Sequence, residues 1–313
     1  MILVNSFVTG GDGSFGNPWT GWDTGTPWAA GQLYQFDAGF YSFGSLAINV
    51  PCTLRGVGGS SLNSSPFGGG WLNSGSFGTV LMSSAISGSA LTFDHPNNSY
   101  SYNLRDLMLL GPGVGTSIGV SLGSSRASVQ NRWDNVYICN FFQGLAFNSV
   151  MDSTFTHIRT NGCVTGGVIG LNSNQNVWDN LQAQHGTIGF QFQQCSQNVI
   201  NGGLSQNVAT GFNICAAANI SLSGIYGEGF ANLFQIDSSL GGVKNCTIRD
   251  VYASGAPNLV NFVGASTVNY FTLENVTWGG SMTIPHNVIN ANIRNVEASF
   301  TSIPLGILTS LSG

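Results

Sequence analysis

The sequence is poor in charge. Only 7% of its 313 residues are Asp, Glu, Lys or Arg, and Lys244 is its single lysine, whereas a typical soluble domain has about 25% charged residues. Proteins that follow the phosphates of a nucleic acid need clustered Lys and Arg, so this composition argues against a nucleic-acid partner. The polarity of the surface must come instead from the uncharged side chains of Asn, Ser, Thr and Gln.

Long apolar runs are also missing. No segment approaches the ~20 apolar residues of a membrane-spanning helix, so no membrane span is predicted. The start, MILVNSFVTGG, has neither the basic region nor the full apolar region of a signal peptide. We therefore expect either that a signal has been removed or that the protein reaches its destination in another way, as a virion component would.

Paired cysteines and clustered acids are absent as well. The six cysteines, at positions 52, 139, 163, 195, 215 and 246, form no Cys-x-x-Cys pair, so zinc spacing is absent. We favour single buried thiols that act as small apolar residues, and disulfides between neighbouring segments stay open. The 13 acidic residues are scattered, so no metal site and no cofactor are predicted.

What the sequence does contain is a repeat. A four-residue pattern, apolar–any–Asn/Asp–apolar, returns as LRDL at 104, WDNV at 133, WDNL at 178, IRDV at 248, LENV at 273 and IRNV at 293, with degenerate copies FTHI at 155 and LSGI at 222. A second series of short alternating strands runs in phase with it: GLAF at 144, IGFQF at 188, TGFNI at 210, NLFQI at 232 and NLVNF at 258. Helical periodicity is nearly absent. A period near 22 made of short strands is typical of a solenoid.

The repeat predicts an all-β fold, a single-stranded right-handed parallel β-helix of about nine or ten coils of ~22 residues. The third residue of the pattern is expected at a sharp corner with left-handed backbone, which Asn and Asp tolerate; His157 and the glycines near 202 and 224 replace Asn there. The Trp-Asp-Asn copies at 133 and 178 are then the same point of two coils, and both tryptophans face inward.

Three segments are predicted. Residues 1–30, rich in Gly and carrying Trp19, Trp22 and Trp28, are expected to cap the first coil, because an open solenoid end exposes its core. Residues 31–298 form the β-helix, with a long loop at 56–79. The apolar residues 299–313 either cap the last coil or contact another subunit.

Several stretches carry a family resemblance. GQLYQFDAGFYSFGSLAINVPCTLRGVGG from Gly31, YNLRDLMLLGPGVGTSIGV and ISLSGIYGEGFANLFQI resemble coils of the pectate-lyase-like superfamily, which includes many phage tailspikes. The resemblance implies a polysaccharide or cell-surface glycan as partner, an extracellular or virion-surface location and a homo-oligomer, with a trimer as the first guess. It does not fix an activity, because the superfamily holds lyases, hydrolases, epimerases and inert spikes.

Two groups of candidate catalytic residues follow from the period. Asp134 and Asp179 occupy the second position of the pattern two coils apart, near 10 Å by strand spacing; inverting glycosidases place their carboxyl groups roughly 6.5–9.5 Å apart. Glu228 and Asp152 are candidate general acids and His185 a candidate base. A glycosidase is favoured over a calcium-dependent lyase. The resemblance implies that such a lyase would bind calcium through clustered acids, and the sequence has no such cluster.

The candidate substrate-binding residues fall in three columns. His185, Asn207 and Glu228 are expected to align approximately on successive coils, beside an outward column that contains Arg159, Gln182, Tyr226 and Tyr252, as in a sugar-binding patch. On the second strand series the outward column reads Ala146, Gln191, Asn213, Gln235 and Asn261. Its amides suit sugar hydroxyls, although a solvated or self-associating amide ladder is the alternative. It has no acid, which departs from the resemblance.

Two functions stay open. The first is a tailspike-like carbohydrate-binding protein that binds, and as an enzyme cleaves, a polysaccharide. The second is a non-enzymatic structural or adhesive protein that associates into an oligomer or filament, because low charge removes a barrier to association.

Overall fold

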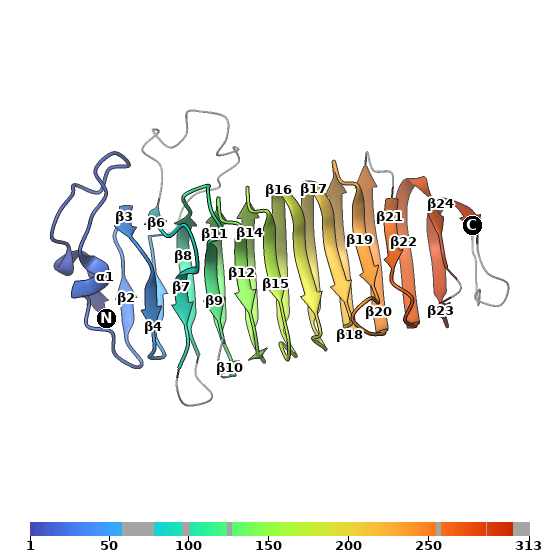
Figure 1. Cartoon of the computed structure of the whole chain (residues 1–313), viewed down its shortest axis with the longest axis horizontal. Coiled ribbons are helices and arrows are strands. Elements are labelled where there is room, and N and C mark those ends of the chain that lie inside the picture. Colours follow the sequence, from blue (N-terminus) through green and yellow to red (C-terminus); the bar gives the residue numbers. More distant parts are fainter. Residues whose placement is uncertain (58–77, 96–100, 124–126, 255–257, 286, 303–313) are drawn as a thin grey trace.

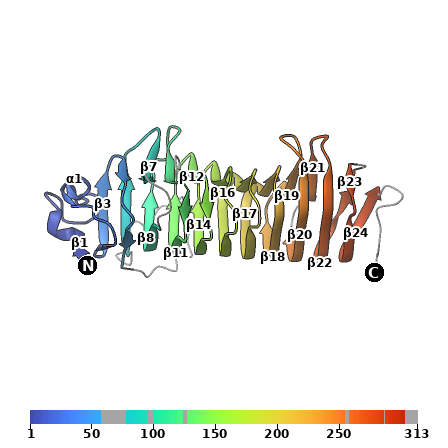
Figure 2. The same ribbon diagram turned by 90° about the horizontal axis from the view of Figure 1, so that it is seen from below.

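A computed structural model of the chain describes residues 1–57, 78–95, 101–123, 127–254, 258–285 and 287–302. These residues wind into one elongated solenoid of about 10 turns, whose coils stack along the long axis of the molecule (Figure 1). Figure 2 shows the same stack from another side, with β1 (Ile2–Leu3) and α1 (Trp22–Gly25) at one end and β24 (Asn292–Ser302) at the other. The predicted right-handed parallel β-helix is confirmed.

The strands build three long faces, which we name A, B and C, and a short fourth side, where residues 128–129 pair with residues 150–151 and isolated bridges continue through Asn174 and Ser196. Face A contains β4 (Leu46–Ile48), β7 (Ser89–Phe93), β9 (Ile118–Leu122), β12 (Gln143–Phe147), β15 (Thr165–Ile169), the last parts of β16 (Val177–Gln193) and β17 (Val199–Cys215), β19 (Asn232–Asp237) and β21 (Asn258–Val263). Neighbouring strands on this face pair in parallel, which is the pairing a solenoid requires.

Faces B and C share most of their strands. Face B begins with β1, β2 (Leu33–Gln35) and β5 (Thr53–Arg55), and face C begins with β3 (Gly39–Phe43) and β6 (Thr79–Ser83). The later strands bend from face B into face C: β8 (Asn103–Leu110), β11 (Arg132–Cys139), β14 (Thr154–Asn161), β16, β17, β18 (Ala218–Glu228), β20 (Val243–Ser254), β22 (Val268–Thr283) and β24. Smaller elements are the 3-10 helix η1 (Val4–Phe7), β10 (Ser128–Val129), β13 (Val150–Met151) and β23 (Val288–Ile289).

The corner between faces B and C is where the sequence pattern predicts it. Left-handed residues occupy this corner in successive coils: Asp106, Asn135, His157, Asn180, Gly202, Gly224, Asp250, Asn275 and Asn295. Some of their side chains bond along the stack, since Asn135 Nδ2 donates to Asp106 Oδ1 at 3.1 Å and Asn275 Nδ2 to Asp250 Oδ1 at 2.9 Å. The predicted backbone geometry, including the substitution by His157, is confirmed.

The pattern missed the other corners of each coil. In the coil that follows Asn131, the residues Asn140, Ser149 and Asp152 also have positive φ, at 61°, 55° and 50°. The next two coils repeat this arrangement of four left-handed residues. Because such residues are mostly Asn, Asp, Gln and Gly, many polar side chains of this sequence are explained by the turning of the backbone.

The interior is rich in buried aromatic side chains. Trp133 and Trp178 are 1% and 0% exposed, and the rings of Trp178 and Phe155 stack with centroids 4.2 Å apart. The two copies of Trp-Asp-Asn therefore occupy the same position two coils apart, as predicted, because Trp133 pairs with Phe155 and Phe155 with Trp178. All six cysteines are buried and unpaired, which confirms the favoured interpretation of the thiols.

The N-terminal segment packs against the first coils. Trp22 is fully buried, and its indole lies against Phe36, Tyr41 and Phe43 with ring centroids 5.3–6.0 Å apart. Its Nε1 donates to the carbonyl of Ser42 at 3.0 Å. The division into cap, β-helix and C-terminal segment stays a prediction, and residues 58–77 of the predicted loop and 303–313 of the C-terminal segment lie outside the described residues.

Candidate functional site

Face C carries an outward column of side chains that spans many coils. The strand register aligns Tyr137, Arg159, Gln182, Leu204, Tyr226, Tyr252 and Thr277 in that order. Arg159, Gln182, Tyr226 and Tyr252 therefore share one column, as the period predicts. Each member is one strand spacing, about 4.8 Å, from the next.

Two tyrosines form an exposed aromatic pair in this column. The rings of Tyr226 and Tyr252 are nearly parallel, at 10°, with centroids 5.7 Å apart. Their side chains remain 38% and 53% exposed. Mutual stacking fixes the ring orientations, so apolar ring surface and two hydroxyls are held ready on the outside of the tube.

The adjacent outward column is a polar ladder that ends on a carboxylate. Gln184 Nε2 donates to Gln206 Oε1 at 2.8 Å, and Gln206 Nε2 donates to Glu228 Oε2 at 3.2 Å. The Tyr226 hydroxyl donates to the same Oε2 at 3.4 Å. Among the described residues none donates to Oε1 of Glu228, so this oxygen is left for solvent or a ligand.

The predicted alignment of His185 and Asn207 with Glu228 is off by one residue. Glu228 pairs in register with Gln206, and Gln206 with Gln184. His185 lies within β16 and Asn207 within β17, at the corner that follows face C, and both are left-handed, with φ of 53° each. The Asn207 carboxamide covers Gly229, because a Cβ on Gly229 would lie 2.5 Å from Asn207 Oδ1. Counting a period does not distinguish the last residue on face C from the corner residue that follows it.

Asp134 and Asp179 share a column on face B, with Thr156 between them. Each carboxylate has a polar neighbour: His157 Nδ1 lies 3.3 Å from Asp134 Oδ1, and Asn201 Nδ2 donates to Asp179 Oδ1 at 3.1 Å. Two strand spacings separate their backbones by about 10 Å, so only convergent side chains reach the separation of an inverting glycosidase.

The amide column of face A is more enclosed than the sequence suggests. Gln191, Asn213 and Gln235 align as predicted, but Val168 precedes Gln191 in the column. Asn213 is only 5% exposed, and its Oδ1 has no hydrogen-bond partner among the described residues. Gln191 Nε2 donates to Gln193 Oε1 at 3.1 Å along its own strand. This column offers less accessible polar surface than face C.

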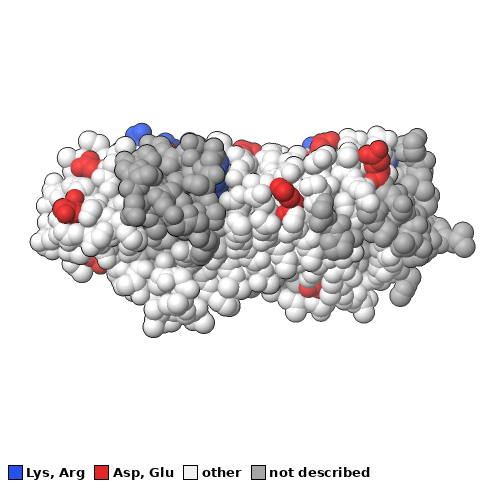
Figure 3. Space-filling view, turned by 90° about the horizontal axis from the view of Figure 1, so that it is seen from above, with Lys and Arg blue, Asp and Glu red and all other residues white. Residues whose placement is uncertain are grey.

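Charged residues are sparse, at 7% of the chain. Figure 3 shows a few acidic and basic side chains scattered among the described residues of one face, most of which are uncharged. Within the described residues, no group of three or more His, Cys, Asp and Glu side chains is arranged to hold a metal ion. The described part of the chain also contains no helix with the length and apolar character needed to cross a bilayer.

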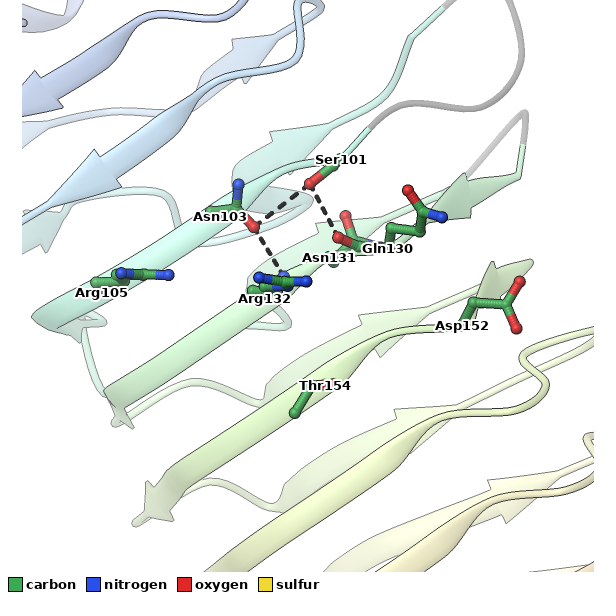
Figure 4. A pocket seen from close by; sticks show the side chains of 8 residues that line it. All are labelled: Ser101, Asn103, Arg105, Gln130, Asn131, Arg132, Asp152 and Thr154. Atoms are coloured by element: carbon green, nitrogen blue, oxygen red, sulfur yellow. Dashed lines mark hydrogen bonds between the residues drawn. The ribbon is translucent and has the colours of Figure 1, made fainter.

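A groove that the sequence did not reveal lies at the edge of face B. It has a volume of about 550 Å³ and is lined by Ser101, Asn103, Arg105, Gln130, Asn131, Arg132, Asp152 and Thr154 (Figure 4). Asp152, a predicted catalytic residue, belongs to this groove and not to the surface that carries Glu228. In the sequence, Arg105 occupies the second position of the pattern copy LRDL, whereas Arg132 lies just before the copy WDNV and so outside the pattern.

Comparison with known proteins adds the fold relationship. No protein-family model and no curated protein matches the chain. Solved structures do: the catalytic unit of a GH87 alpha-1,3-glucanase from Streptomyces thermodiastaticus (TM-score 0.61, 14% identity, 100% of this chain and 68% of that chain) and the A-module of the Azotobacter vinelandii mannuronan C-5 epimerase AlgE6 (TM-score 0.55, 15% identity, 100% and 98%).

A tailspike also shares the fold. The enzymatically active domain of tailspike protein 2 from bacteriophage CBA120 matches with a TM-score of 0.50 and 12% identity, over 86% of this chain and 47% of that chain. The structural neighbours thus include β-helix enzymes that degrade or modify polysaccharides. At these identities the likeness concerns the fold.

Proposed function

We propose that the chain is a carbohydrate-binding β-helix protein that holds an extended polysaccharide along face C and hydrolyses it with Glu228 as the acid. The observation that carries the proposal is the contact of the exposed Tyr226–Tyr252 pair with the polar ladder that ends on Glu228. Sugar sites combine aromatic surface for the C–H faces with a few oriented hydrogen-bonding groups, and both are present here.

The roles follow from the contacts. Tyr252, Tyr226 and Gln182 bind sugar units on one column, while Gln206 and Gln184 accept or donate to hydroxyls on the other. Tyr226 and Gln206 hold Oε2 of Glu228, so Oε1 is the oxygen that delivers a proton to the leaving group. His185, the base, lies about two strand spacings, or ~10 Å, from Glu228 along the solenoid axis. This separation leaves room for a water between base and acid.

The remaining predicted residues have secondary places in this proposal. Arg159 extends the binding surface toward earlier coils, and Asn207 extends it toward the corner after face C. The face A amides Gln191, Asn213 and Gln235 contact only sugar units at the margin of the bound polysaccharide. The Asp134 and Asp179 column on face B is the second candidate for hydrolysis. We further propose an extracellular or virion-surface location and a homo-oligomer, a trimer being the first form to test.

The test is incubation of the full chain with a panel of polysaccharides, measuring reducing ends and the absorbance of unsaturated products. We expect Glu228→Gln to lower turnover by roughly 10²–10⁴-fold while glycan binding is retained. Tyr252→Ala is expected to weaken binding about threefold to tenfold. Glu274→Gln, an acid on face B, is the matched control and should change neither property.

Two outcomes redirect the proposal. Turnover that survives in Glu228→Gln but is lost in Asp179→Asn would move the active site to face B. Absence of binding to every glycan, together with fibres in electron micrographs, would favour the structural or adhesive protein instead.

A further inference from the structure

The groove at the edge of face B holds two arginines on one side. Arg105 comes from β8 and Arg132 from β11, and Figure 4 shows both side chains lying over these neighbouring strands, with Asp152 toward the opposite end of the groove. The chain has only seven arginines and one lysine, so two in one groove of about 550 Å³ is a local concentration of positive charge.

The strand register fixes the two arginines as diagonal neighbours. Arg105 pairs with Asp134 on the next strand, and Arg132 begins that strand, where its backbone N–H donates to Asn103 Oδ1 at 2.8 Å. Side chains in such a diagonal relation are within reach of one another when they are long. Arg55 pairs in register with Arg105 from the other side, which brings a third guanidinium to the same face.

The neighbouring carboxylates do not neutralise the pair. Asp106 lies 3.8 Å from Arg55, and Asp134 contacts His157 at 3.3 Å. Among the described residues, neither the Arg105 guanidinium nor that of Arg132 has an ion pair or a side-chain hydrogen bond. By contrast, Arg249, which occupies the same column as Arg105 further along the solenoid, lies 4.0 Å from Asp250.

We propose that the groove binds one oxyanion, a carboxylate or a sulfate group, between Arg105 and Arg132. Guanidinium groups match the oxygens of such anions in a bidentate fashion, and an anion removes the repulsion between two adjacent cations. Gln130 and Thr154 line the rest of the groove as hydrogen-bonding groups. Asp152 repels an anion and accepts hydroxyl protons, so it orients a ligand with its charge toward the arginines.

The oxyanion has two possible sources, a free inorganic ion or a charged substituent of a glycan. The glycan source rests on the function proposed above, whereas the oxyanion site itself does not. The groove belongs to face B and the corner that precedes it, and the Tyr226–Tyr252 pair belongs to face C. The two surfaces can therefore be tested separately.

The experiment is a calorimetric titration of the full chain with sodium sulfate and with two oligosaccharides of the same backbone, one bearing uronate carboxylates and one reduced to the neutral sugar. We expect Arg105→Gln and Arg132→Gln each to weaken anion binding about tenfold. Arg249→Gln, the matched control, should leave it unchanged. Raising the ionic strength should weaken binding in the unsubstituted chain, because salt screens exposed charges.

Each outcome decides the proposal. Binding of sulfate that competes with the acidic oligosaccharide supports the site with both sources, and binding of the acidic oligosaccharide alone supports a glycan substituent. Equal affinity for acidic and neutral oligosaccharides with no sulfate binding, or anion binding that survives in both arginine variants, overturns it. Tyr252→Ala should leave sulfate binding intact, so failure of the face C proposal is recognised independently. Thermal unfolding of each variant checks that its fold is retained.

Discussion

Face C has different chemistry in its early and its late coils, although the strands are stacked in one register. Its outward column runs through Phe40, Val80, Met108 and Tyr137 in the early half and continues through Arg159, Gln182, Leu204, Tyr226 and Tyr252 in the late half. The four early members are 1–9% exposed, whereas the two tyrosines at the late end are 38% and 53% exposed.

The adjacent outward column changes in the same place. It reads Met82, Leu110 and Cys139 in the early half, then Asn161, Gln184, Gln206 and Glu228. At the boundary, Asn161 Nδ2 donates to the Tyr137 hydroxyl at 2.9 Å. Part of the cover over the early half comes from the N-terminal segment, because Phe15 lies against Phe40 with ring centroids 5.5 Å apart.

The difference shows what limits a ligand surface on a solenoid. Outward side chains on every coil point away from the interior, but among the described residues of face C the early members are buried and the large exposed side chains lie in the late half. The early half is a second apolar cluster on the outside of the tube, made of Phe40, Val80, Met108, Leu110, Tyr137 and Cys139. Face C is therefore a core in one half and a surface in the other.

The largest expected effect tests this contrast by stability. Met108→Ala should lower the free energy of unfolding by about 2–5 kcal/mol, as for a truncated core methionine, because Met108 is only 5% exposed. Leu204→Ala, at the same column in the open half, should cost about 1 kcal/mol. Denaturant unfolding monitored by tryptophan fluorescence measures both. Equal losses would mean that the two halves are covered alike.

The sequence predicted the fold because the information is repeated locally. Inward aromatic and aliphatic residues return near every 22 positions, so one miscounted coil does not disturb the pattern, and Trp133 and Trp178 were correctly interpreted as core residues. Column membership of Tyr226 and Tyr252 followed from the same count, since register in a solenoid is additive.

The sites were harder to predict for physical reasons. His185 and Asp152 look like isolated functional groups in the sequence, but both are left-handed corner residues, and three of the four corners had no recognisable pattern. The groove of Arg105 and Arg132 forms because β8 and β11 pair with an offset of 29 residues, as Leu104 does with Trp133. This offset differs from the period near 22, and it makes the two arginines diagonal neighbours. Which half of face C is covered depends on segments that leave the repeat, and a period carries no information about them.

An intermediate effect is expected at alkaline pH. It tests whether the covered half of face C excludes solvent as well as the interior does. Burial raises the pKa of the Cys139 thiol well above its usual value of 9.0, and it raises the pKa of the interior Cys246 to about 12. A raised pKa in the folded state means that the stabilisation is fully present below pH 9 and is lost as the pH rises toward 12, at about 1.4 kcal/mol per pKa unit for a single group.

The free energy of unfolding should therefore fall between pH 9 and 12, measured by denaturant titration at each pH. Cys139→Ala and Cys246→Ala should each make that fall shallower, because each removes one buried thiol that must ionise. If only Cys246→Ala changed the pH dependence of the unfolding free energy, the Cys139 thiol would be accessible to solvent. The covered half of face C would then not be equivalent to the interior.

The smallest effect on the fold sharpens the comparison at a single column. Ser254 follows Glu228 in the register of face C and is partly exposed, whereas Cys139 stands in the same column and is 0% exposed. Ser254→Cys replaces an oxygen by a sulfur and should leave the unfolding midpoint nearly unchanged. At pH 8 a chromogenic disulfide reagent should then titrate one thiol in the folded variant, since an exposed thiol has a pKa near 8.5, and none in the unsubstituted chain. Guanidinium should release all six native thiols, which calibrates the assay. A fast-reacting thiol in the folded, unsubstituted protein that disappears in Cys139→Ala would place solvent over the early half of face C and remove the distinction between the two halves.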